Sequence, residues 1–562
     1  MARIVVSAFV SDRHLALALA VGAALVVNGI WWGWVEEWNP DEMALRSLLA
    51  PGRGFLEPGE FLKPPFHTYL NFFLSVLPIK IVERLTEVAT GRAQDFAPII
   101  LYWSRLIQLA LFLGIVWLSY RIVARFSTAV SARSVAFITA TSAGFILQAH
   151  FLTADIPVTF WMLASFACAQ SILFSGRWRD YLTAGLVAGV ATATKYNGLA
   201  VGLAIPIFHW FAHRATPLPR LALDPRLMAG VAMVVVGFVL ANPYSVLDFQ
   251  RFSTDFMYNY VTTPIYGGGD TTASGYGTFL MRIPEILGWP MALATLAGVA
   301  FIVVSLRRAS VTERANVIAA LGVVALYFWK FGAPPRVEVR FVLPIVPFLL
   351  VATAPSWSAF VRRYEHVAVG VVAALLVYNV LASYSVGRRF AEDPRMGAQS
   401  WVAAHVPRGS RMESSQYTPH WNLYQGTRVT DIRIPSVSGR TRLFATMFAS
   451  DSWEMRRTRQ SNPDDAVGWY QPATLAERRP DFIALDSIYI DRFLEGETAQ
   501  LYPEMRTFLK TLLAGQLGYH VVYDQSSRGS PAWLYPREMV FVDNHVVILK
   551  RDVSRDADGI SE

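Results

Sequence analysis

An acidic pair, Asp41-Glu42, follows the first long apolar stretch of the chain, and Lys63 comes about twenty residues later. A carboxylate can take a proton from a hydroxyl group, and an ammonium can bind a phosphate. Ionisable side chains at a membrane face are costly unless something uses them. The spacing of these three residues therefore indicates a functional site at one face of a membrane.

The composition places the chain in a lipid bilayer. Of its 562 residues, 53% are hydrophobic and 16% are charged, whereas soluble domains carry about 25% charged residues. The mean hydropathy is +0.34. A spanning helix needs roughly twenty mostly apolar residues, and about eleven such stretches precede residue 390. We therefore predict a multi-pass, all-α membrane domain with the bilayer as its partner.

Most of the predicted spans are separated by short polar loops. They run over Leu15–Trp34, Ile99–Tyr120, Val135–Phe151, Ile156–Phe174, Tyr181–Thr194, Gly198–Phe211, Leu227–Leu247, Ile283–Leu306, Val317–Trp329, Phe341–Trp357 and Val367–Tyr384. The net charge of +8 comes from arginine clusters between these runs. Such clusters orient spans in a membrane, so the charge does not indicate a nucleic-acid partner.

The arginines also predict the orientation. With a cytoplasmic N-terminus, the inner loops hold clusters such as Arg121 to Arg133 and Arg214 to Arg226, as the positive-inside rule expects. Counting the apolar stretch Phe66 to Val82 as a further span would move later clusters outside. We therefore predict an interfacial helix there, within a long first outer loop over 36–98. A second outer loop covers 243–282.

After Tyr384 the long apolar runs stop, which predicts two domains: a membrane domain over 1–388 and an extracytoplasmic α/β domain over 389–562. The tail is predicted to contain strands at Asp481–Asp486, Tyr519–Asp524 and Phe541–Lys550, and helices at Ala398–His405 and Phe508–Gln516. The single cysteine, Cys168, lies in an apolar run, so no intrachain disulfide is expected.

Several short motifs follow one another on the predicted outer face. They are Pro40-Asp41-Glu42, Lys63-Pro64-Pro65, Leu152-Thr153-Ala154-Asp155, Lys195 after a Gly/Ala-rich helix, Asn242-Pro243-Tyr244 and Arg340-Phe341-Val342-Leu343-Pro344. In this order they resemble the polyprenyl-phosphate-sugar-dependent glycosyltransferases of the GT-C fold, close to the protein mannosyltransferase and lipid A aminoarabinose transferase group. The resemblance covers most of the chain and implies the GT-C fold for the membrane domain.

The resemblance also implies an activity: transfer of a sugar from a polyprenyl-phosphate donor to an acceptor hydroxyl of a glycan, lipid or protein. That reaction needs a base for the hydroxyl and cations for the phosphate that leaves. The implied catalytic residues are Asp41 as general base, Glu42 and Asp155. The implied donor-phosphate-binding residues are Lys63, Arg105, Lys195 and Arg340.

The carboxylates have structural alternatives. Asp41 and Asp155 could each cap a helix, because Pro40 and Pro157 stand at positions that suit a first turn. Glu42 could position Asp41, bind the acceptor or remain a solvated charge. These alternatives stay open on the sequence.

The cations have alternatives too. Lys63 and Arg340 could extend to the interface and hold a helix end, and Lys195 and Arg105 could pair with carboxylates. His67 could bind a metal, although a lone histidine beside aromatic residues is more often simply hydrogen-bonded. The metal site is therefore unknown. The lipid-linked sugar is the expected co-substrate, no other cofactor is certain, and a divalent metal is possible.

The expected location is the cytoplasmic membrane, with transfer at its outer face. Two other functions remain open: a lipid or glycolipid transporter of the flippase type, and a non-catalytic envelope scaffold. Transporters usually carry charges near the bilayer midplane and show repeated halves. Here the charges collect at one face and no repeat is visible, which favours the transferase.

Overall fold

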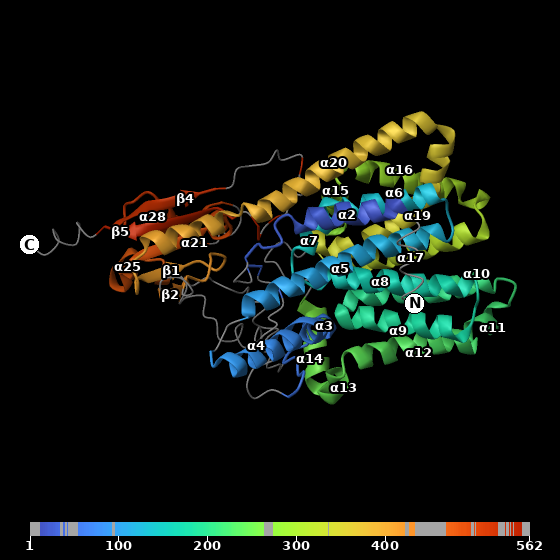
Figure 1. The fold of residues 1–562 in the computed structure, drawn as a ribbon, viewed down its shortest axis with the longest axis horizontal. Helices are drawn as coiled ribbons and strands as arrows, with labels where there is room; N and C mark the ends of the chain where they lie inside the picture. The colour runs from blue at the N-terminus through green and yellow to red at the C-terminus, as the bar shows by residue number, and fades with distance from the viewer. Residues whose placement is uncertain are drawn as a thin grey trace, which may run out of the picture.

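The structure is a computed structural model. It describes residues 12–33, 38–39, 42, 54–92, 96–262, 274–334, 337–421, 426–432, 468–495, 499–500, 502–526, 534, 539, 541–542 and 544–552. Asp41, the predicted base, lies outside these ranges. A bundle of helices forms one part of the molecule, and a small sheet domain lies at one end of it, where α20 (Glu365–Ala391) leaves the bundle (Figure 1).

A helix occupies the position of every predicted span, so the all-α class of this domain is confirmed. The helices at these positions are α2 (Arg13–Val27), α5 (Ala97–Ala124), α6 (Ala129–Ala140) with α7 (Ala143–Ala149), α8 (Asp155–Gln170) with η3 (Ser171–Leu173), α9 (Trp178–Thr194), η4 (Tyr196–Leu203) with α10 (Ala204–Ala212), α12 (Pro225–Ala241), α16 (Trp289–Ser305) with η5 (Leu306–Arg308), α17 (Val311–Phe331), α18 (Val339–Val342) with η6 (Leu343–Ile345) and α19 (Val346–Arg363), and α20.

Not all of these helices have the length of a span. Among the described residues, 7 are long and apolar enough to cross a membrane, and the pair α6 and α7, bent by 54°, would make 8. The helices α2, α9 and η4 with α10 are shorter. The predicted number of about eleven spans therefore stays a prediction.

The short helices outside the spans gather at the two ends of the bundle. They are α3 (Phe66–Asn71), η2 (Phe72–Val76), α4 (Leu77–Thr90), α11 (Leu218–Ala222), α13 (Tyr244–Leu247), α14 (Phe249–Thr262) and α15 (Tyr276–Leu287). In Figure 1, α3, α4, α13 and α14 lie at the end that carries the sheet domain, and α11 lies at the other end. The segments predicted for the outer face thus share one end of the bundle.

The helix α4 is amphipathic and has no buried residue. It exposes Ile81, Leu85 and Val88, and ion pairs such as Lys80 to Glu83 lie along it. An amphipathic helix of this kind suits the membrane surface. It lies outside the helices that are apolar enough to span, as the interfacial prediction for this segment expected.

Glycines bring α9 and α12 into close contact. A Cβ added to Gly189 would lie 2.3 Å from the carbonyl oxygen of Val234, and one added to Gly185 would lie 2.0 Å from that of Gly230. Small residues at a helix interface allow the backbones to approach, which stabilises helix pairs in lipid. The end of α9 is therefore fixed against its neighbour, and Lys195 follows directly.

The tail contains a five-stranded mixed sheet in the order β2-β1-β3-β5-β4. Its strands are β1 (Arg411–Ser414), β2 (Arg428–Asp431), β3 (Phe482–Asp486), β4 (Tyr519–Gln525) and β5 (Val546–Arg551), and its helices are α21 (Pro394–His405), α25 (Pro472–Arg478), α26 (Ser487–Leu494) and α28 (Pro503–Leu513). The strands β1, β2 and β3 are parallel, and β5 runs antiparallel to both β3 and β4.

Successive residues of the central strands face opposite sides of the sheet. On β3, Phe482 and Ala484 pack in one core with Ala398 of α21, whereas Ile483 and Leu485 pack in another that includes residues of α26 and α28. Both faces are therefore covered, as the predicted α/β class requires.

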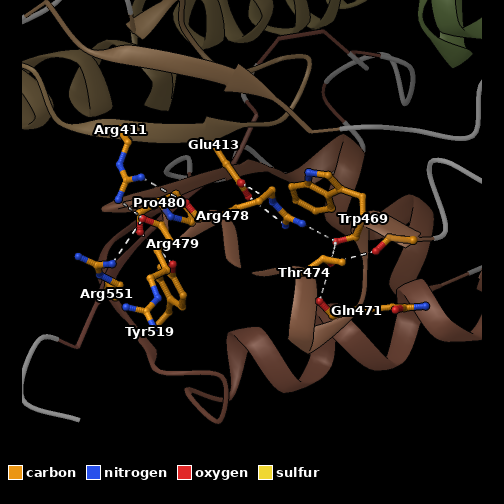
Figure 2. A network of polar contacts seen from close by, with 11 residues as sticks. Arg411, Glu413, Trp469, Gln471, Thr474, Arg478, Arg479, Pro480, Tyr519 and Arg551 are labelled. Atoms are coloured by element: carbon orange, nitrogen blue, oxygen red, sulfur yellow. Dashed lines mark hydrogen bonds and ion pairs between the residues drawn. The ribbon is translucent and has the colours of Figure 1, made fainter. Parts of the chain in front are cut away.

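A polar network joins β1 to α25. Glu413 is buried and its Oε1 lies 2.6 Å from Arg478 Nε, while the guanidinium of Arg478 lies 4.1 Å from the ring centroid of Trp469 (Figure 2). Burial raises the pKa of Glu413, and Arg478 opposes that shift. The arginine thus neutralises a carboxylate that the sheet would otherwise bury alone.

Two tail predictions need correction. The predicted strand Phe541–Lys550 begins only at Val546, because Val542 N–H bonds the carbonyl of Met539 in a turn and Val542 packs with the membrane-domain core. The predicted helix Phe508–Gln516 begins earlier, at Pro503, and ends at Leu513, before Gly515 with its φ of +77°.

Candidate functional site

The centre of the candidate site is an ion pair between Asp155 and Lys195. Asp155 begins α8, and Lys195 follows α9 in an extended conformation. The two helices are joined by a short connection, which brings the start of one and the end of the other to the same end of the bundle. Lys195 Nζ lies 2.6 Å from Asp155 Oδ1, and the two side chains are 26% and 3% exposed.

Two further segments lie next to this pair, one with Tyr327 and one with Phe341. Lys195 Nζ lies 5.3 Å from the ring centroid of Phe341, and the carbonyl of Phe341 accepts a hydrogen bond of 2.8 Å from Tyr327 Oη. Asn197 Nδ2 in turn donates to Tyr327 Oη. Arg340 stands next to Phe341, with its Nε 2.6 Å from Glu338 Oε2. The guanidinium of Arg340 lies 5.3 Å from the ring centroid of Phe341, so two cations lie near this ring.

His67 reaches the pair from α3. It is buried, and Asn71 Nδ2 lies 3.2 Å from its Nε2. Burial lowers the pKa of His67 to about 3, although the nearby carboxylate of Asp155 opposes that shift. The imidazole is therefore neutral at physiological pH and can accept or donate a hydrogen bond at the site.

A second cluster holds the chain just before Asp155. Glu42 Oε1 accepts a hydrogen bond of 3.1 Å from Leu152 N–H, and Gln108 Nε2 donates to the carbonyls of Phe151 and Thr153, at 2.8 Å each. Glu42 and Arg105 are both buried, with 3.6 Å between Oε1 and Nη2. These contacts fix the backbone over 151–153, and thus the start of α8.

Glu42 is not fully satisfied. Its Oε2 is buried without a hydrogen-bond partner among the described residues. Burial raises the pKa of Glu42, and the positive charge of Arg105 opposes that shift. Arg105 Nη1 also donates to the carbonyls of Ile30, at 3.1 Å, and Trp32. Glu42 and Arg105 thus join the end of the first helix to the segment before Asp155.

The loop before Lys63 is held at its backbone. Phe61 N–H donates to Asp255 Oδ2 at 2.9 Å, and the Phe61 carbonyl accepts from Tyr196 Oη at 2.7 Å. Since Tyr196 follows Lys195 directly, the loop is tied to the segment that carries the central lysine. Lys63 itself is exposed, as expected for a side chain that could reach a lipid headgroup.

The structure therefore brings the predicted residues together in two pairs, Asp155 with Lys195 and Glu42 with Arg105. Lys195 forms an ion pair with a carboxylate, that of Asp155, which is one of the two alternatives that the sequence left open for it. Arg105 also pairs with a carboxylate, that of Glu42. Asp41 lies outside the described residues.

Three residues at the site were missed by the sequence analysis: Gln108, Tyr327 and Asp255. Gln108 could have been predicted from the sequence, because it lies three positions after Arg105 in an apolar helix and therefore shares the face of Arg105. Asp255 and Tyr327 gave no such signal, since their roles depend on contacts with distant segments. Among the described residues, no group of three or more His, Cys, Asp or Glu side chains could hold a metal ion.

The arrangement can neutralise an anion and hold carboxylates beside it. Lys195 and Arg340 lie at one end of the bundle with Asp155. Glu42 accepts a hydrogen bond from Leu152 N–H, three positions before Asp155 in the chain. A phosphate at this place would meet cations on structured elements, and a hydroxyl would meet a carboxylate. Cations and carboxylates are the residue types that a transfer reaction with a phosphate leaving group requires.

Comparisons with known proteins give one family-model match and several structural matches. Residues 102–242 match the family model described as dolichyl-phosphate-mannose-protein mannosyltransferase. No curated protein matches the chain. Among solved structures, ArnT from Cupriavidus metallidurans bound to undecaprenyl phosphate matches with a TM-score of 0.51 and 13% identity, covering 95% of this chain and 97% of that one.

The same ArnT in the apo state gives a TM-score of 0.50 and 14% identity, with coverage of 97% and 98%. The apo oligosaccharyltransferase of Archaeoglobus fulgidus gives 0.47 and 13%, with coverage of 94% and 75%. At these identities the ArnT matches establish a shared fold over nearly the whole chain. The family match covers Arg105, Asp155 and Lys195.

Proposed function

We propose that this protein, a membrane glycosyltransferase of the GT-C fold, transfers a sugar from a polyprenyl-phosphate donor to an acceptor hydroxyl at the outer face of the cytoplasmic membrane. The observation that carries the proposal is the partly buried ion pair of Asp155 and Lys195, at one end of the bundle. Lys195 and Arg340 both lie against the ring of Phe341. This arrangement supplies a carboxylate and cations on rigid elements.

Two findings support the choice of donor. The matched family is described by a lipid-phosphate sugar, dolichyl-phosphate-mannose. The ArnT structure with the same fold contains undecaprenyl phosphate. A donor of this kind has a phosphate at the headgroup plane and a lipid tail in the bilayer. The interfacial face of α4 and the exposed Lys63 suit such a ligand.

In the proposed reaction, the acceptor oxygen attacks the anomeric carbon of the sugar while the bond from that carbon to the phosphate oxygen breaks. Asp41 takes the proton of the acceptor hydroxyl. The bond electrons leave with the polyprenyl phosphate, whose added negative charge is stabilised by Lys195, Lys63 and Arg340. One displacement of this kind inverts the anomeric configuration.

The other carboxylates have supporting roles in this proposal. Asp155 orients the ammonium of Lys195 toward the phosphate through their ion pair. Glu42 fixes the segment that leads into α8 through its bond to Leu152. Arg105, which lies against Glu42, maintains that contact. Each is placed to hold a reacting group in position, which is where much of the rate of a two-substrate reaction originates.

The test is transfer of radiolabelled sugar from polyprenyl-phosphate donors in membranes that contain equal amounts of wild-type protein, Asp41→Asn or Asp155→Asn. We expect Asp41→Asn to lose at least about 100-fold in rate, since general-base catalysis contributes 10²–10⁴-fold. Asp224→Asn is the control, because Asp224 caps α12 away from the site and asparagine keeps the cap.

The outcomes separate the alternatives. Transfer by the wild type and Asp224→Asn, with loss in Asp41→Asn, would support the proposal. Transfer that survives in folded Asp41→Asn would reject Asp41 as the base. If folded wild-type protein moves whole donor lipid between leaflets of vesicles without transferring sugar, the protein is a transporter.

A further inference from the structure

A buried cluster joins the tail domain to the end of the first helix. Arg395, at the start of α21, is fully buried and its Nη2 lies 2.7 Å from Asp393 Oδ2. Its guanidinium lies 5.1 Å from the ring centroid of Trp32 and 4.5 Å from that of Trp38. Trp32 Nε1 donates to the same Asp393 oxygen at 2.8 Å. A residue of the tail thus lies between two tryptophans of the N-terminal segment.

The tail holds Arg395 from its other side. Arg395 Nη2 donates to the carbonyl of Phe541, at 2.6 Å, in the segment that leads to β5. Asp393 caps α21 by accepting from Arg395 N–H at 3.0 Å. The side chain is therefore bonded to two distant parts of the tail domain, the start of α21 and the chain before β5.

Trp32 continues this connection toward the candidate site. It is fully buried, its carbonyl accepts from Arg105 Nη1, and the guanidinium of Arg105 lies 5.5 Å from its ring centroid. Arg105 lies against Glu42, and Glu42 accepts from Leu152 N–H. Every step from Arg395 to Leu152 is a direct contact between buried groups.

We propose that Arg395 is a positioning residue for the transfer reaction: through Trp32 and Arg105, the tail domain fixes Glu42 and the segment before Asp155. The inference rests on the proposed function for its kinetic consequence only. The tail then acts in catalysis as part of the scaffold of the acidic loop. This role requires no sugar-binding surface on the tail.

The physical reason is that each member of this chain depends on its neighbours. A buried guanidinium is stable only where carboxylate, carbonyl and aromatic partners replace water. Loss of Arg395 leaves Asp393 buried without its cation and removes the contact that orients both tryptophans. Arg105 then loses a fixed Trp32 carbonyl, and Glu42 is no longer held in one position.

The experiment compares the full-length wild type, Arg395→Gln and the control Arg388→Gln in detergent. Arg388 lies on α20, a short distance along the chain, and pairs with Glu392 at the surface. The first measurement is amide hydrogen exchange of peptides that cover 150–155, where Leu152 N–H reports its bond to Glu42. We expect about tenfold faster exchange there in Arg395→Gln and none of this change in Arg388→Gln.

The second measurement is steady-state transfer. Misplacement of a reacting group by about 1 Å costs on the order of 100-fold, so we expect kcat to fall by at least about tenfold in Arg395→Gln. The donor KM should change by less than about threefold, because the contacts reach Lys195 only indirectly, through Asp155, and none of the contacts from Arg395 to Leu152 includes Arg340. A purely structural role for the tail would lower the amount of folded protein and leave kcat and the donor KM of the folded enzyme unchanged.

If Arg395→Gln does not fold, Trp32→Phe takes its place. Phenylalanine keeps an aromatic ring beside both arginines, removes the Nε1–H bond to Asp393 and is smaller than tryptophan. The same changes should appear at smaller size, because Arg395 keeps its ion pair with Asp393. Wild-type exchange over 150–155 in a folded Arg395→Gln or Trp32→Phe protein would overturn the proposal. If exchange over 150–155 is faster in the variant but even the wild type transfers no sugar, the coupling is supported and the proposed function is rejected.

Discussion

Replacing Lys195 by methionine removes the ammonium that lies 2.6 Å from Asp155 Oδ1 and keeps most of the side-chain volume. Asp155, 3% exposed, would then hold a negative charge without that cation. Breaking a buried pair in this way costs about 3–5 kcal/mol. Because the lysine side chain is 26% exposed, water can approach the carboxylate, and we expect the lower end of that range, about 3 kcal/mol.

The double variant Asp155→Asn with Lys195→Met separates electrostatics from packing. It removes both charges, so the buried carboxylate no longer opposes folding, and we expect stability within about 1 kcal/mol of the wild type. Sugar transfer should fall on the order of 100-fold or more in both variants, since the cation for the leaving phosphate is absent from each.

The assay is unfolding by SDS titration in mixed micelles, with transfer measured on the same preparations. Arg226→Met is the control, because Arg226 pairs with Asp224 at 2.8 Å with both side chains more exposed, so it should cost at most about 1 kcal/mol. Wild-type stability in Lys195→Met, or a double variant as unstable as the sum of the single ones, would refute the reasoning that the pair is one buried electrostatic unit.

Two further predictions concern the elements around the pair. Gly189→Ala should lower the free energy of unfolding by about 2 kcal/mol, because its Cβ would lie 2.3 Å from a backbone oxygen of α12; Gly370→Ala, whose Cβ meets nothing within 4 Å, should not destabilise, and equal effects would contradict the packing argument. For His67, the folded-state pKa of about 3 lies below the ordinary value of 6.5, so the unfolded chain gains a proton first as the pH falls, and stability declines below pH 6.5. This should cost about 2 kcal/mol between pH 7.5 and 5; His67→Gln should remove that part of the pH dependence in parallel SDS titrations, and identical slopes would contradict burial of a neutral imidazole.

The sequence alone determined the membrane fold. Long apolar runs form helices in lipid because no other conformation satisfies the backbone there, so a helix stands at each predicted span. The stretch Phe66 to Val82, which charge placement left outside the spans, is not among the described helices that are long and apolar enough to cross a membrane. The tail strands β3 and β4 were found because their side chains follow a clear strand pattern. The short β1 and β2 were missed because four-residue strands carry too little pattern to detect.

The sequence also named the charged residues at the site, since a charge near a membrane face is rare and costly. It could not tell which partner each would meet. Asp155 pairs with Lys195 across 40 residues, and Trp32 bonds Asp393 across 361. Such pairs depend on which helix ends share one end of the bundle, and that follows from packing. The local sequence thus determined which charged residues belong to the candidate site and at which end of the bundle they lie. Their contact partners were decided by the tertiary structure, because contact between distant segments leaves no local pattern.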